Sequence, residues 1–93
     1  MGIINKKMTN PSFKNVWNKN KHFELTKDDG IAHNVNDIVV LQEYNDKKGE
    51  SGNEIIVKIN EVKREVDGIE IGWCIIGFKV LDRVQGINAI GEW

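Results

Sequence analysis

The chain has 93 residues, of which 40% are hydrophobic and 29% charged, and its net charge is −1. This length predicts one domain, and the composition is typical of a folded globular protein rather than a disordered chain. The single cysteine, Cys74, excludes an intrachain disulfide and a cysteine-ligated zinc site. No apolar stretch reaches the about 18 residues of a membrane span, and Lys6 and Lys7 interrupt any signal-peptide core. We expect a cytoplasmic protein without membrane contact or cofactor, and favour a monomer.

The charges are unevenly distributed along the chain. Residues 1–27 carry six lysines and one glutamate, whereas the rest of the chain is acidic. A basic end on an acidic domain is typical of a surface that contacts phosphate groups, and equally of a solvated lysine-rich face. If the first interpretation holds, Lys6 and Lys7 assist binding by phosphate contact.

The N-terminal part of the chain predicts a helix after a first extended segment. Residues 1–9 read as a loose arm or an edge strand. Asn10-Pro11 is typical of a helix start, because Asn caps exposed amides and Pro needs no donor at the first helical position. Phe13, Val16 and Trp17 follow at helical spacing and share one face, which we expect to pack in the core.

A short strand follows this helix. Residues 22–25 alternate polar and apolar side chains, as a half-buried strand does. We expect Phe23 and Leu25 to face the core, and Glu24 and Thr26 to lie on the opposite face.

The rest of the chain reads as a series of strands. Ile55, Val57 and Ile59 alternate with polar residues and share one face, and Asp67-Gly68 is a strong hairpin signal. The expected segments are a doubly buried strand at 38–44, a polar loop at 45–53, strands at 54–63 and 69–81, and a C-terminal tail at 82–93. Together they predict a mainly β (α+β) fold, a single domain over residues 1–93 formed by a small barrel of five to six strands with one N-terminal helix.

Two runs of residues in this order resemble a known family. They read Lys19-Asn20-Lys21-His22-Phe23-Glu24-Leu25-Thr26-Lys27-Asp28-Asp29 and Val35-Asn36-Asp37-Ile38-Val39-Val40-Leu41-Gln42-Glu43-Tyr44. With the later Gly72-Trp73-Cys74-Ile75-Ile76, they look like the ASCH domain of the PUA-like superfamily, in its small bacterial and phage DUF3850-type branch. The resemblance covers residues 11–81.

The resemblance implies a PUA-like barrel with a ligand cleft between the helix and the strands. Members of the family are thought to bind RNA or nucleotide-like ligands there, and at least one bacterial relative is an amidohydrolase of a modified cytidine. Carried over by position, Lys21, Glu24, Lys27 and Asp29 match residues of the motif. Thr26 stands where the motif has an arginine, so the planar donor that suits phosphate or carboxylate is missing.

The expected ligand- or RNA-binding set combines the motif with its neighbours. Tyr44, at a strand end, is the residue that we expect to stack on a base. The full set is Lys21, Glu24, Thr26, Lys27, Asp29, Tyr44, Lys6 and Lys7.

Two alternatives to a binding function stay open at this point. One is a small amidohydrolase acting on an N4-acylcytidine-like nucleoside, in which Lys21, Glu24 and Thr26 are the catalytic residues, because a hydroxyl beside a lysine and a carboxylate can form a nucleophile. The other is a non-catalytic interaction module with a degenerate cleft, which requires a filled cleft beside Glu24. His22 and His33 lack metal-ligand spacing, so we expect no metal site and place both at the surface.

Overall fold

A computed structural model describes residues 2–27, 32–64 and 67–86 of the chain. Within these ranges, no helix has the length and hydropathy needed to cross a membrane. The elements, in chain order, are β1 (Ile3–Met8), α1 (Ser12–Trp17), β2 (Phe23–Lys27), β3 (Ile38–Asn45), β4 (Gly49–Lys63) and β5 (Trp73–Val84).

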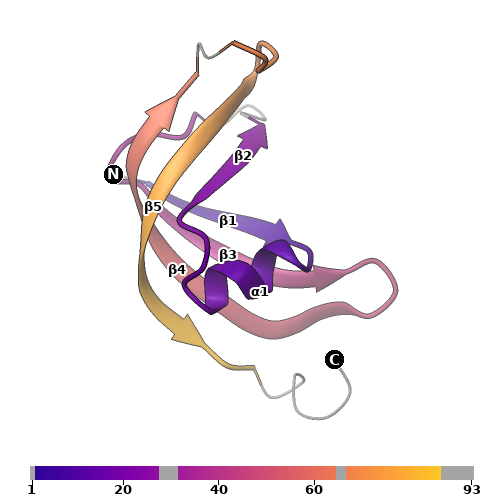
Figure 1. Cartoon of the computed structure of the whole chain (residues 1–93). Helices are drawn as coiled ribbons and strands as arrows, with labels where there is room; N and C mark the ends of the chain where they lie inside the picture. Colours follow the sequence, from indigo (N-terminus) through magenta and orange to yellow (C-terminus); the bar gives the residue numbers. More distant parts are fainter. Residues whose placement is uncertain (1, 28–31, 65–66, 87–93) are drawn as a thin grey trace.

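The strands form one sheet of order β1-β3-β4-β5-β2. β1 runs parallel to β3, and the other neighbouring pairs are antiparallel. Figure 1 shows the sheet curled into a half-barrel, with α1 on its concave side. Among the described residues β1 and β2 do not pair with each other, so they are the two edges of an open sheet. The five strands therefore agree with the predicted number, and the predicted mainly β fold is confirmed, but the sheet is a half-barrel where a barrel was expected.

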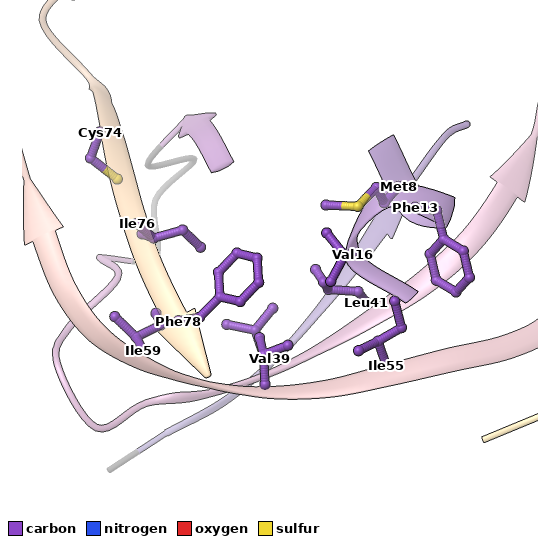
Figure 2. Close-up of a cluster of buried hydrophobic side chains, with 11 residues drawn as sticks. Met8, Phe13, Val16, Val39, Leu41, Ile55, Ile59, Cys74, Ile76 and Phe78 are labelled. Carbon is purple, nitrogen blue, oxygen red and sulfur yellow. The ribbon is translucent and has the colours of Figure 1, made fainter. Parts of the chain in front are cut away.

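The hydrophobic core fills the concave side of this half-barrel. Residues on alternating positions of β3, β4 and β5 point inward, as expected for strands with one buried face. The prediction that Ile55, Val57 and Ile59 share such a face is confirmed. Figure 2 shows Phe13 and Val16 of α1 packed toward β3 and β4 from above the sheet. The six-residue α1 follows β1 and is held on the sheet by these two buried side chains.

The orientation of β2 is the reverse of the sequence expectation. Phe23 is 59% exposed, whereas Thr26 is 2% exposed. The reason is the register with β5, in which Glu24 lies opposite Ile76 and Thr26 opposite Cys74. Opposed residues of an antiparallel pair share a face, and Ile76 and Cys74 point into the core.

Several element boundaries also differ from the predicted ones. The expected loop at 45–53 is mostly part of a long hairpin, because β3 extends to Asn45 and β4 begins at Gly49. Residues 69–72 precede β5 instead of opening it, and Gly72 has a φ of 92° that favours glycine. β5 extends into the expected tail as far as Val84. β3 alternates between buried and half-buried residues rather than being buried on both faces.

Asp37 fixes the start of both β1 and β3. Its Oδ1 accepts the backbone N–H of Gly2 at 2.9 Å, and its Oδ2 accepts the backbone N–H of Asn34 at 3.0 Å. The hydrogen bond from Gly2 is the main reason that the pKa of the Asp37 carboxyl lies below its ordinary value. The first residues are therefore an anchored edge strand and not a loose arm.

The exposure of Phe23 on the outer face of β2 can be tested by comparison with Phe13, the buried phenylalanine of α1. Phe13→Ala removes a side chain that is 1% exposed and should lower the free energy of unfolding by about 3–5 kcal/mol. Phe23→Ala removes an exposed ring and should cost only about 0.5 kcal/mol. Urea denaturation followed by tryptophan fluorescence gives both values. Equal losses for the two variants would contradict the orientation of β2.

Candidate functional site

A hollow lies between the two unpaired edges of the half-barrel. We call the gap between the edge strands β1 and β2 the seam. The hollow in it has a volume of about 190 Å³ and is here called the seam hollow. β1 and the start of α1 border it on one side and β2 on the other. The lining residues are Lys6, Lys7, Met8, Thr9, Ser12, Glu24 and Leu25.

Glu24 and Lys21 form an ion pair beside this hollow. The Lys21 Nζ lies 3.2 Å from the Glu24 Oε2, and the two side chains are 23% and 18% exposed. Residues three apart in a strand point to opposite faces, but Lys21 precedes β2, which begins at Phe23. This placement lets the two side chains converge. The structure thus brings together the two motif residues on which the binding hypothesis depends.

Lys6 and Lys7 approach the seam from different faces of β1. Lys6 lies between Ile4 and Met8 on the inward-facing positions and is half-buried. Its ammonium group makes no ion pair with any residue that the structure describes. Lys7 is exposed, and its Nζ lies 4.7 Å from the centroid of the Tyr44 ring. With Lys21, these lysines give the seam three cations for the single carboxylate of Glu24.

Thr26 lies on the same face of β2 as Glu24 but deeper in the fold. Its hydroxyl is buried and finds no hydrogen-bond partner among the described residues. A nucleophilic hydroxyl needs a base within hydrogen-bond reach, and the Lys21 ammonium is instead engaged by Glu24. The arrangement of these three residues is therefore not that of an activated nucleophile.

The other predicted site residues do not line the seam hollow. Lys27 has an exposed position on the outer face of β2, and Asp29 lies outside the described residues. Tyr44 lies on the outer face of β3, where it borders a second hollow of about 370 Å³, here called the Tyr44 hollow. The lining residues of the Tyr44 hollow are Thr9, Asn10, Tyr44, Asn45, Asp46 and Lys47.

A third hollow, here called the outer hollow, lies on the convex side of β2 and β5. It has a volume of about 270 Å³ and is lined by Leu25, Gly68, Ile69, Glu70 and Trp73. It is largely apolar, and Glu70 supplies its charge. A phosphate-bearing ligand would find no cation among these lining residues.

Glu43 is a buried carboxylate that the expected ligand-binding set does not include. Its Oε1 accepts hydrogen bonds from Ser51 Oγ at 2.8 Å and Asn53 Nδ2 at 3.0 Å, and its Oε2 accepts one from Asn10 Nδ2 at 2.6 Å. These donors come from the β1–α1 connection and from β4, so Glu43 ties that connection to β3 and β4. Counting in twos from Val39 and Leu41 along β3 would have placed this side chain inward.

The histidines occupy different environments. His22 is exposed as expected, but the prediction of a surface position for His33 is wrong, because its side chain is buried. The Arg64 Nη2 donates to the His33 backbone carbonyl at 2.6 Å and ties this connection to the end of β4. Among the described residues, no group of three or more histidine, cysteine or acidic side chains is arranged to hold a metal ion.

Two comparisons with known proteins bear on this site. A family model described as "Domain of unknown function (DUF3850)" matches residues 5–78, which include most of β1, all of α1 and of β2 to β4, and half of β5. The match therefore contains both edges of the seam and both motif residues of the ion pair. No curated protein matches the chain.

The buried hydroxyl of Thr26 leads to a stability prediction. Thr26→Val replaces an unpartnered hydroxyl with a methyl group of similar shape, which should raise the free energy of unfolding by about 1 kcal/mol. Urea denaturation gives the value, and Thr26→Ser, which keeps the hydroxyl and loses a methyl group, is the matched control that should destabilise. A loss of stability in Thr26→Val would show that the hydroxyl has a partner.

Proposed function

Since the chain belongs to the DUF3850 family, whose function is unknown, we propose a function from the geometry of the chain itself: it binds RNA or a nucleotide-like ligand at the seam between β1 and β2. The observation that carries the proposal is the half-buried Lys6, which lines the seam hollow and makes no ion pair among the described residues. A lysine ammonium group donates charge-assisted hydrogen bonds to phosphate and carboxylate oxygens, so an anionic ligand group is the partner that fits.

Different residues of the seam are suited to the phosphate and to the base of a nucleotide. Lys6, with Lys7 at the rim, provides the cations for a phosphate group. The Glu24 carboxylate borders the same hollow and can accept hydrogen bonds from the exocyclic amine of a base. Lys21 holds the Glu24 carboxylate in place through their 3.2 Å contact.

The two alternative functions find less support in this geometry. An amidohydrolase needs an activated nucleophile, and the Thr26 hydroxyl has no hydrogen-bond partner among the described residues. An interaction module with a degenerate cleft requires a filled space beside Glu24, whereas Glu24 lines a hollow there.

The wider family relationship and the location of the protein are part of the same proposal. The curled five-stranded sheet and the order of the motifs support a place in the ASCH/PUA-like superfamily. A buried lone cysteine, Cys74, fits a reducing compartment such as the cytoplasm.

The proposal is tested by titrating the protein with cytidine and uridine monophosphates at low salt, using isothermal titration calorimetry. We expect measurable binding and a loss of about tenfold in affinity for Lys6→Ala, which removes a charge-assisted contact. Lys79→Ala is the matched control, since Lys79 is exposed on the outer face of β5 opposite Lys58, and it should change the affinity by less than twofold.

Glu24→Gln should lower the affinity for cytidine monophosphate more than the affinity for uridine monophosphate, because of the two bases only cytosine donates hydrogen bonds from an exocyclic amine. Absence of binding to either nucleotide, or equal losses for Lys6→Ala and Lys79→Ala, would overturn the proposal.

A further inference from the structure

We propose that the ligand is a single-stranded RNA segment of at least two nucleotides, which runs from the seam hollow around the end of β1 to a base stacked on Tyr44. The inference rests on the proposed function of the seam and extends it to a second subsite. The natural ligand is then a single strand of RNA and not a free mononucleotide.

The seam hollow and the Tyr44 hollow are neighbours at the end of β1. Thr9, just after β1, lines both the seam hollow and the Tyr44 hollow. Lys7 lines the seam hollow, and its ammonium group lies over the Tyr44 ring at 4.7 Å. A ligand that leaves the seam along Lys7 and Thr9 therefore arrives at Tyr44 without crossing another element.

The second step is the size of the hollows. The seam hollow, at about 190 Å³, is smaller than the about 300–1,000 Å³ of pockets that enclose a small molecule. The Tyr44 hollow, at about 370 Å³, lies within that range. Two open neighbouring hollows suit successive units of a strand better than one enclosed nucleotide.

The third step is the chemistry of the Tyr44 hollow. The half-buried Tyr44 lines this hollow, and the face of its ring opposite the Lys7 ammonium group is the stacking surface of the proposal, since an aromatic face can stack on every base. The Lys47 ammonium also lines this hollow and makes no ion pair with the part of the chain that the structure describes. Asp46 is the one acidic residue of the lining and partly offsets this charge. Lys7, between the two hollows, is then placed for the phosphate that joins the nucleotides.

The fourth step is the rigidity of the turn that presents Lys47. The Asn45 Oδ1 accepts the backbone N–H groups of Lys47 and Lys48 at 2.9 Å and 3.1 Å. Asn10, on the other side of the hollow, is held by its 2.6 Å hydrogen bond to the buried Glu43. Both walls are thus fixed before a ligand arrives, which lowers the cost of ordering on binding.

The experiment compares a uridine tetranucleotide with uridine monophosphate on the full chain, using fluorescence anisotropy for the labelled tetranucleotide and calorimetry for the mononucleotide. We expect the tetranucleotide to bind more tightly. Tyr44→Leu keeps an apolar side chain but removes the aromatic ring. It should therefore lower the affinity for the tetranucleotide by about 5- to 150-fold, the range for losing one stacked base. The affinity of Tyr44→Leu for the mononucleotide should stay within twofold of the wild-type value. Tyr44→Phe, which keeps an aromatic ring, should bind both ligands with wild-type affinity.

Two further probes separate stacking from charge. A tetranucleotide that lacks its bases cannot stack on Tyr44. Its affinity for the wild type should therefore not exceed the affinity of the intact tetranucleotide for Tyr44→Leu. Lys47→Ala should lower the slope of log affinity against log salt concentration by about 0.7, the value for one lost phosphate contact on a single strand.

The outcomes distinguish this inference from the function on which it rests. If the mononucleotide binds and Tyr44→Leu does not weaken the tetranucleotide, the second subsite is refuted and the seam site stands. Equal affinity for the tetranucleotide and for an RNA duplex long enough to stay fully paired under the assay conditions would also refute it, because duplex bases are not available for stacking. If neither ligand binds, both proposals fail.

Discussion

The pairing of β2 with β5 is the constraint on which the candidate site depends. The five residues of β2 pair with β5 by antiparallel hydrogen bonding, in a register that places Thr26 opposite Cys74 and Glu24 opposite Ile76. Because side chains alternate along a strand, a shift of one residue would exchange the two faces. It would bury Phe23 and Leu25, expose Glu24 to solvent and remove the carboxylate from the seam.

The open edge follows from the same arrangement. Within the part of the chain that the structure describes, β1 and β2 each pair on one side only, so the half-barrel ends in two edges with charged residues between them. Unpaired edges are a liability in soluble proteins and are commonly protected by charged side chains, lysine above all. Lys6, Lys7 and Lys21 therefore have a structural reason to be at the seam, and the same charges make it suitable for a phosphate. The buried Glu43 and its hydrogen bonds keep this end of the sheet in shape.

The sequence predicted the strands and the Lys21–Glu24 pair, but not the faces on which most site residues lie. Lys21 and Glu24 could be found because the motif order resembles a known family. The face of β2 could not, since a short alternating strand with one apolar set is compatible with either orientation until its partner is known. Tyr44 was placed correctly near a strand end, but it lies on the outer face of β3, which separates it from Glu24. The burial of His33 depends on how a connection packs, which no local pattern reports.

The account is tested most directly by mapping the binding surface. Backbone amide shifts of the labelled protein, recorded by NMR during titration with the uridine tetranucleotide, should change most at Lys6 to Thr9, Glu24, and Tyr44 to Lys47. Such a result would place the ligand along the seam and around the end of β1. Shifts concentrated at Ile69 to Trp73, beside the outer hollow, would contradict the account.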